Sequence, residues 1–354
     1  MRLSNLVTLS LMGVASAAPA RHHEHVDKRD AVTTTVKTQV TVTQGATGQT
    51  NALLQEDAVL DTTTTAAAAA TAAAAAGTTS TLEPSSTSSN SYPSSSVAAG
   101  SAKGITYSPY ASDGTCKSAS DVASDLAQLT DYGIIRLYGV DCSQVENVLQ
   151  AKTSSQKLFL GIYYVDQIAA GVSTIKSAIE SYGSWDDVYT VSVGNELVNG
   201  GEASTSQVGE YISTARTALT AAGYTGSVVS VDTFIAVINN PDLCNYSDYM
   251  AVNAHAYFDE NTTAENAGPW VLEQIQRVWT ACGGKKDVLI TESGWPSQGQ
   301  TYGVAVPSKA NQKAAISSIE DTCGSATILF TAFNDYWKSD GTYGVEKYFG
   351  ILSD

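Results

Sequence analysis

Two glutamates in this sequence each stand at the end of an apolar run. Glu196 follows the segment Val191-Ser-Val-Gly-Asn, and Glu292 follows Val288-Leu-Ile-Thr. Two carboxylates that face one cavity can hydrolyse a glycosidic bond, because one protonates the leaving oxygen while the other attacks the anomeric carbon or activates water. The pair therefore predicts glycoside hydrolysis.

Either glutamate taken alone is also consistent with a solvated loop acid or with a charge near a helix N-terminus. The pair is more informative, since both acids occupy equivalent positions on different predicted strands. A carboxylate separation of roughly 5 to 5.5 Å would indicate direct attack by one carboxylate and retention of configuration. Asn195, directly before Glu196, is expected to hydrogen-bond a sugar hydroxyl.

Aromatic residues cluster at the ends of other predicted strands. The apolar face of a pyranose can lie on such rings, while its hydroxyls reach polar edges. Each ring alone is more often part of a core than of a sugar subsite, so the expectation rests on the group. Together with Asn195, the predicted substrate-binding residues are Tyr107, Tyr138, Tyr163, Tyr257, Trp295 and Trp337.

The elements that would position these residues alternate along the chain. Helical spacing of apolar residues, as in Val122, Leu126 and Leu129, separates short runs that are rich in β-branched and aromatic residues. Eight such runs predict strands at 104–107, 134–138, 157–163, 188–193, 227–233, 249–254, 288–291 and 327–332.

Eight strands interleaved with helices over about 250 residues predict an α/β fold of the (β/α)8 barrel type. The active site of such a barrel lies at the C-terminal ends of its strands, so Glu196 on strand four and Glu292 on strand seven would face each other across the mouth. An open doubly wound sheet is the rival fold, but no Gly-x-Gly-x-x-Gly turn follows the first strand.

Composition divides the chain into four predicted segments. Residues 1–17 have the pattern of a secretory signal peptide, and residues 18–29 are expected to be a propeptide that ends at the dibasic pair Lys28-Arg29. Residues 30–100 are rich in Thr, Ala and Ser, which predicts a disordered segment with O-glycosylation. Residues 101–354 form the predicted barrel domain, preceded by this segment in a secreted chain.

Charge and motif content exclude several function classes. A formal net charge of −16 argues against binding to nucleic acid or to anionic membranes. His255 is the single histidine of the barrel region, and we interpret it as a hydrogen-bonded residue of the site wall and not as a metal ligand. No metal and no cofactor are therefore expected. The sequence also lacks a Gly-x-Ser-x-Gly elbow and a P-loop.

The cysteines indicate a secreted chain, which we expect to be a monomer. Five cysteines without metal spacing predict an oxidising compartment, with two disulfides and one leftover thiol that spacing cannot assign. No hydrophobic tail follows residue 350, so no lipid anchor is expected at the membrane. Asn245 and Asn261 begin N-glycosylation triplets.

The segments Val193-Gly-Asn-Glu196 and Ile290-Thr-Glu-Ser-Gly-Trp-Pro296 together resemble glycoside hydrolase family 17, the β-1,3-glucanases. Lys103-Gly-Ile-Thr-Tyr-Ser-Pro-Tyr110 and Arg136-Leu-Tyr-Gly-Val-Asp-Cys142 resemble its fungal soluble cell wall branch, and the resemblance extends to Leu352. It does not cover the Thr/Ala/Ser-rich segment.

This resemblance implies a retaining enzyme of the cell wall, with β-1,3-glucan as its partner, Glu196 as acid/base and Glu292 as nucleophile. It also implies that Lys338 and Glu346 help to frame the nucleophile. Three functions remain open at this point: endo-hydrolysis of β-1,3-glucan, transfer of the glycosyl group to another glucan chain, and glucan binding without turnover.

Overall fold

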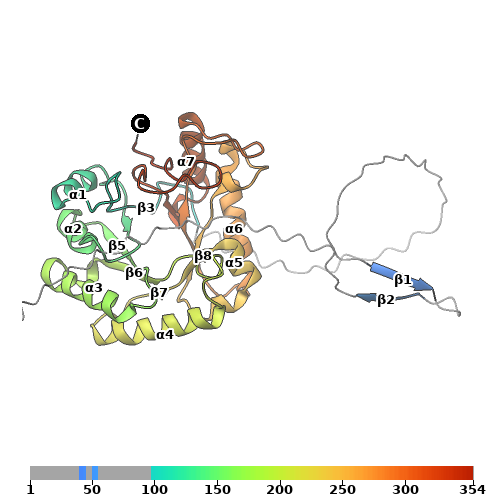
Figure 1. Cartoon of the computed structure of the whole chain (residues 1–354), viewed down its shortest axis with the longest axis horizontal. Coiled ribbons are helices and arrows are strands. Elements are labelled where there is room, and N and C mark those ends of the chain that lie inside the picture. Colours follow the sequence, from blue (N-terminus) through green and yellow to red (C-terminus); the bar gives the residue numbers. More distant parts are fainter. Residues whose placement is uncertain (1–39, 45–49, 55–96, 354) are drawn as a thin grey trace, which may run out of the picture. The chain divides into compact units, whose positions relative to one another are not determined.

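The computed structural model describes residues 40–44, 50–54 and 97–353 (Figure 1). The described residues belong to two units, with residues 40–44 and 50–54 in the smaller one and residues 97–353 in the larger one. In the smaller unit, β1 (Val40–Gln44) pairs antiparallel with β2 (Thr50–Leu54), a pairing that the sequence analysis did not predict. The predicted signal peptide, the propeptide and most of segment 30–100 lie outside the described residues.

A parallel sheet forms the centre of the larger unit, and the α/β barrel prediction is confirmed. The strands follow the order β7-β6-β5-β4-β3-β11-β10-β9-β8. All eight predicted strands are present at their expected positions. The fifth is present as two pieces, β7 and β8, so among the described residues this sheet has nine strands: β3 (Gly104–Thr106), β4 (Ile134–Arg136), β5 (Lys157–Ile162), β6 (Val188–Val193), β7 (Val228–Val229), β8 (Val231–Thr233), β9 (Met250–Asn253), β10 (Val288–Ser293) and β11 (Thr327–Leu329).

The predicted fifth strand is divided in two at Ser230. The Ser230 N–H donates to the side-chain oxygen of Ser247 at 2.8 Å, whereas β7 pairs with β6 and β8 pairs with β9. The two ends of the sheet are therefore consecutive pieces of one chain segment. The sheet closes on itself through this segment, as a (β/α)8 barrel requires.

Helices surround the strands in Figure 1. Two of these helices have a serine N-cap that forms a capping box. Ser118 and Ser204 each exchange hydrogen bonds with the residue three positions later. The helices are α1 (Ala119–Leu126), α2 (Gln144–Ala151), α3 (Ile168–Tyr182), α4 (Thr205–Ala221), α5 (Phe234–Asn239), α6 (Ala267–Ala281) and α7 (Lys309–Cys323). The short 3-10 turns are η1 (Trp185–Asp187), η2 (Pro241–Asn245), η3 (Ala256–Phe258), η4 (Ala264–Asn266) and η5 (Gly324–Ala326).

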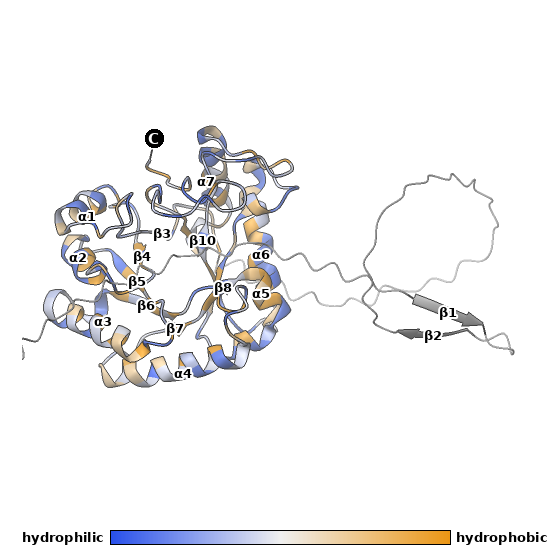
Figure 2. Cartoon of the chain, viewed as in Figure 1, coloured by the Kyte–Doolittle hydropathy of each residue, from blue (hydrophilic) through white to orange (hydrophobic). Residues whose placement is uncertain are grey.

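The apolar residues form two layers of core. The larger layer lies between strands and helices, and it includes the periodic positions Val122 and Leu126 of α1. In Figure 2 the strands are largely coloured as hydrophobic, while the helices carry both colours. The smaller layer fills the barrel interior and consists of Ile134, Phe159, Val229, Val231, Ala251, Leu289 and Ile328.

The cysteine prediction is confirmed for the described residues, which hold two disulfides and one free thiol. Cys116 is bonded to Cys142, and Cys244 is bonded to Cys282. Cys323, at the end of α7, is free and buried. The first disulfide joins the segment after β3 to the segment after β4, so it links two loops on the side of the barrel where the strands end.

Gly294, just after β10, lies close to the main chain that follows β11. A Cβ atom at this position would lie 2.0 Å from the carbonyl oxygen of Phe330. At Gly133 the nearest atom to a Cβ would be the Lys103 carbonyl oxygen at 3.4 Å, an ordinary contact.

We predict that Gly294→Ala lowers the free energy of unfolding by about 1–3 kcal/mol, because the backbone must move to admit the methyl group. Gly133→Ala should change it by less than about 0.5 kcal/mol. Urea unfolding of both variants measures the difference. Equal effects of the two substitutions would contradict the close approach at Gly294.

Candidate active site

Glu292 is buried near the end of β10, with an exposure of 1%. Its Oε1 atom accepts hydrogen bonds from Arg136 Nη1 at 3.0 Å and from the Tyr138 hydroxyl at 2.8 Å. Its Oε2 atom lies 3.2 Å from His255 Nε2, which donates in the tautomer protonated at that nitrogen. The carboxylate is thus held on both oxygens by groups from two other strand ends.

A bulge in β10 explains how Glu292 reaches the mouth. The register with β9 shifts between Ile290 and Glu292, so two residues of β10 oppose a single step of its neighbour. In a regular strand, Thr291 and Glu292 would point to opposite faces. Here the Thr291 hydroxyl donates to Asn253 Oδ1 at 2.9 Å while Glu292 contacts Arg136, so both side chains join the same network.

Arg136 connects the two halves of the site. Its Nη1 donates to Glu292 Oε1, to the Thr291 carbonyl at 2.8 Å and to Asn253 Oδ1 at 3.3 Å. Its Nη2 donates to Asn195 Oδ1 at 2.9 Å. The planar guanidinium presents donors in a fixed fork, so one buried side chain orients groups from β9, β10 and the segment after β6.

Glu196 lies just after β6 and is half-buried. Its Oε1 atom accepts a hydrogen bond from Asn253 Nδ2 at 2.7 Å. The oxygen of the same Asn253 amide accepts a hydrogen bond from Arg136, which also donates to Glu292. Two side chains, Asn253 and Arg136, therefore bridge the predicted carboxylate pair. Asn195, predicted to bind substrate, also faces this bridge.

Three of the predicted substrate-binding rings are buried in the described structure, and their contact with substrate stays a prediction. Tyr107, Tyr257 and Trp295 are each 0% exposed. Their polar groups donate hydrogen bonds inside the protein. The Tyr107 hydroxyl donates to Asp125 at 2.8 Å, the Tyr257 hydroxyl to the Gln300 carbonyl at 2.5 Å, and the Trp295 indole N–H to the Val306 carbonyl at 3.1 Å. Segments folding over from elsewhere in the chain cover these rings.

The remaining predicted rings are partly exposed. The Trp337 ring centroid lies 4.7 Å from that of Tyr110, and its indole nitrogen bonds to Ser108 and Asp335. Tyr163 packs edge-on against Tyr164 at 5.3 Å. Tyr138 differs from these rings because its hydroxyl contacts Glu292 directly and its ring lies 4.4 Å from the Arg136 guanidinium carbon.

Lys338 forms an ion pair with Asp335 at 3.1 Å and lies 4.7 Å from the centre of the Phe330 ring. Glu346 is buried, with an exposure of 4%. Their role in framing Glu292 stays a prediction. Arg136, to which the sequence analysis assigned no role, supplies a cation in direct contact with Glu292.

The residues that sequence reasoning missed are Arg136 and Asn253, and it gave His255 only a wall position. Each carried a weak signal. Arg136 is a charge inside the apolar run Ile134-Ile-Arg-Leu137, and Asn253 and His255 follow the apolar residues of β9. A polar side chain at the mouth end of a barrel strand is a candidate site residue even without a known motif.

The described residues include no cluster of three His, Cys, Asp or Glu side chains that could hold a metal ion. Within the same residues, no helix is long and apolar enough to cross a membrane. Both predicted N-glycosylation positions, Asn245 and Asn261, have exposed side chains. Their modification stays a prediction.

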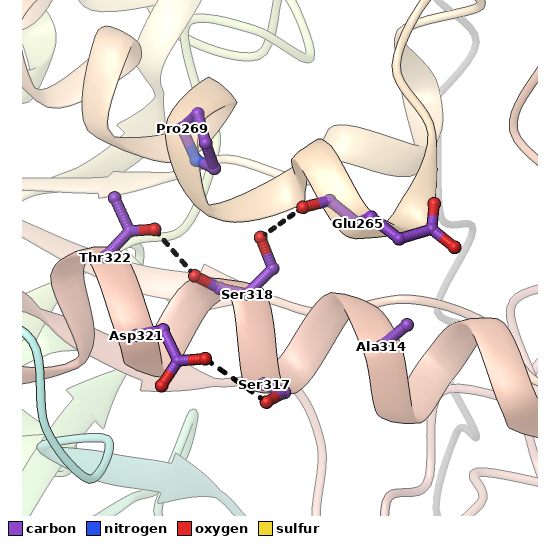
Figure 3. Close-up of a pocket in the computed structure, with 7 residues that line it drawn as sticks. All are labelled: Glu265, Pro269, Ala314, Ser317, Ser318, Asp321 and Thr322. Carbon is purple, nitrogen blue, oxygen red and sulfur yellow. Dashed lines mark hydrogen bonds between the residues drawn. The ribbon is translucent and has the colours of Figure 1, made fainter.

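A separate hollow of about 410 Å³ lies on the outer helices (Figure 3). Ser318 at its centre donates to the Glu265 carbonyl at 2.7 Å and joins α7 to η4. The hollow contains none of the residues that surround Glu196 or Glu292. It is lined by Glu265, Pro269, Ala314, Ser317, Ser318, Asp321 and Thr322.

Comparison with known proteins agrees with this geometry. The BtgE/BtgC glycoside hydrolase domain matches residues 104–350. The chain is 65% identical to the probable family 17 glucosidase SCW10 of Saccharomyces cerevisiae, over 100% of both chains. It is 67% identical to the cell surface mannoprotein MP65 of Candida albicans, over 75% of this chain and 70% of that protein.

A solved structure shares the fold. It is an active-site mutant of the Rhizomucor miehei β-1,3-glucanosyltransferase in complex with laminaritriose, with a TM-score of 0.60 and 22% identity. The match covers 72% of this chain and 93% of that one. At this identity the likeness supports the barrel architecture and leaves the chemistry to the residues themselves.

We predict that Tyr138→Phe impairs glycoside cleavage, because it removes one donor to Glu292 and keeps the ring beside Arg136. A hydrogen bond to a charged group contributes about 1.5–3 kcal/mol, which corresponds to a fall of roughly 10- to 100-fold in kcat/KM. Hydrolysis of laminarin measures this change. Tyr182→Phe, on the exposed side of α3, is the control and should retain full activity. Full activity of Tyr138→Phe would show that the contact is dispensable.

Proposed function

The chain belongs to glycoside hydrolase family 17, and we propose that it cleaves β-1,3-glucosidic bonds of fungal cell wall glucan by double displacement. The observation that carries the proposal is the pair of glutamates at the barrel mouth, bridged by Asn253 and Arg136. Similarity to a probable family 17 glucosidase and to a cell surface mannoprotein supports both the reaction and the location in the wall.

Glu292 is the nucleophile in this proposal. Its carboxylate is fully buried, yet it is paired with the Arg136 guanidinium and hydrogen-bonded by Tyr138, so it can remain ionised away from water. These donors also restrict its rotation and hold it ready to attack the anomeric carbon. The attack forms a glycosyl-enzyme ester and releases the aglycone sugar.

Glu196 is the acid/base. It is half-buried at the rim, and its Oε1 atom is oriented by a neutral amide, Asn253. In the first step it gives a proton to the leaving glycosidic oxygen. In the second step it takes a proton from the incoming hydroxyl, which then displaces Glu292 and restores both carboxyl groups to their starting states.

The identity of the incoming hydroxyl separates hydrolysis from transfer. Water gives hydrolysis, whereas a hydroxyl of a second glucan chain gives a longer product. Transfer is the second candidate function, because the partly exposed rings of Tyr110, Trp337, Tyr163 and Tyr164 offer stacking surfaces for an additional sugar. The resemblance in fold to a β-1,3-glucanosyltransferase is consistent with it.

A purely glucan-binding role is the third alternative. It is disfavoured because the site contains two features that glucan binding alone does not require. These are a buried ion pair and a second carboxylate oriented toward the same mouth. Burying an ion pair costs free energy of desolvation, which a binding groove built from aromatic rings would not require.

The proposal is tested by incubating the full chain with a β-1,3-gluco-oligosaccharide of defined length and following product length and anomeric configuration. Shorter products with the β configuration would support hydrolysis by a retaining mechanism. Products longer than the substrate would show transfer. Initial products with inverted configuration would exclude the covalent intermediate on Glu292.

We predict different behaviour for the two Glu→Gln variants. Glu196→Gln should lose about 10²- to 10⁴-fold activity on oligosaccharides, whose leaving group needs a proton. With a 2,4-dinitrophenyl β-glycoside, whose leaving group departs without one, azide should accelerate turnover of this variant and give a β-glycosyl azide, because azide attacks the glycosyl-enzyme without a general base. Glu292→Gln should lose activity on every substrate and show no such rescue. Rescue of Glu292→Gln to the β product would reverse the assigned roles.

A further inference from the structure

The backbone of Glu196 has a conformation that few residues adopt. Its φ angle is +54°, in the left-handed region, and Gly194, two residues earlier, has a φ of +72°. A non-glycine residue in this region is uncommon and persists only where its surroundings hold it there. Something in the structure must therefore restrain the turn that carries Glu196.

The restraint comes from two consecutive residues of β8. The Glu196 N–H donates to the carbonyl oxygen of Val231 at 2.9 Å. The carboxylate of Asp232 accepts from the N–H of Val198 at 2.9 Å and from the N–H of Asn199 at 3.2 Å. The main chain is thus held at Glu196 itself and again two and three residues later.

Asp232 is an unusual residue for this position. Its side chain is only 3% exposed, and its hydrogen-bond donors in the described structure are main-chain N–H groups, from Val198 and Asn199 and from Thr233 at 2.9 Å. Burial raises the pKa of Asp232 to about 6, and the same three N–H groups act in the opposite direction. A buried carboxylate costs free energy, which indicates that these bonds serve a purpose beyond packing.

We propose that Asp232 is a positioning residue that locks the turn after β6 and so directs the Glu196 carboxyl group toward the leaving oxygen. The inference rests on the proposed role of Glu196 as acid/base. A carboxylate suits the task because each of its oxygens accepts a donor from the turn, Oδ2 from Val198 and Oδ1 from Asn199. An amide offers one oxygen, and its NH₂ group would oppose one of these N–H donors.

The experiment compares two substrates of one enzyme. A β-1,3-gluco-oligosaccharide has a poor leaving group that needs a proton, whereas 2,4-dinitrophenyl β-laminaribioside has a leaving group that departs without one. Asp232→Asn in the full chain is expected to lower kcat/KM for the oligosaccharide by about 10- to 100-fold, because small misplacement of a catalytic group has effects of this size. The kcat/KM for the dinitrophenyl glycoside should change less than about threefold, since formation of the glycosyl-enzyme from this substrate does not depend on the acid.

A purely structural role would give a different result. Loss of folded enzyme lowers both rates by the same factor, so equal losses on the two substrates would overturn the proposal, as would full activity on both. Asp248→Asn is the matched control, because Asp248 also accepts a main-chain N–H, from Val228 at 2.7 Å, but lies next to β7 and pairs with Arg216. Its variant should show no difference between substrates.

Two further variants keep the result interpretable. Asp232→Glu retains the charge and shifts the acceptor by one methylene, so it should show the same difference between substrates if the Asn variant does not fold. Glu196→Gln removes the acid itself, so it gives the largest difference in kcat/KM loss between the two substrates that misplacement of the acid can produce. If Glu196→Gln shows no difference between the substrates, the assigned acid/base role fails; if it does and Asp232 variants do not, only the positioning role fails.

Discussion

The buried ion pair between Arg136 and Glu292 is the interaction on which the rest of the site depends. Both side chains are 2% exposed, and their charged atoms lie 3.0 Å apart. Removing one member of such a pair typically costs about 3–5 kcal/mol, because the other charge is left buried without compensation. Tyr138 and His255 bond the carboxylate oxygens of the acid, and Asn195 accepts from Nη2 of the base, while the buried Nε of Arg136 has no hydrogen-bond partner among the described residues.

The barrel can hold this charge because its interior is layered. Along β4, Ile134 belongs to the apolar interior cluster, and Arg136, two residues later on the same face, enters the polar network. Ala251 and Asn253 repeat this arrangement on β9. These two strands therefore change from apolar to polar along one face as they approach the mouth, so the charged network lies above a layer of buried apolar side chains.

Several residues at the mouth depart from the local rules that hold elsewhere in the fold. Glu196 has a left-handed backbone, β10 shifts its register before Glu292, and Asp232 keeps a carboxylate in the protein interior. Such departures are expected at functional sites, where the position of a group matters more than its local stability. The stable barrel beneath them offsets their cost.

The sequence by itself determined the barrel, the strand ends and the two glutamates, because strand and helix periodicity and the residue after each apolar run are local features. Only the tertiary structure decided the partners of those glutamates. Arg136 and Glu292 are 156 residues apart, and their contact depends on barrel closure and on the bulge in β10. The same reason explains why the burial of Trp295 could not be predicted from its place after β10: its indole N–H donates to the Val306 carbonyl of a later segment, and no local pattern reports which segment folds over a ring.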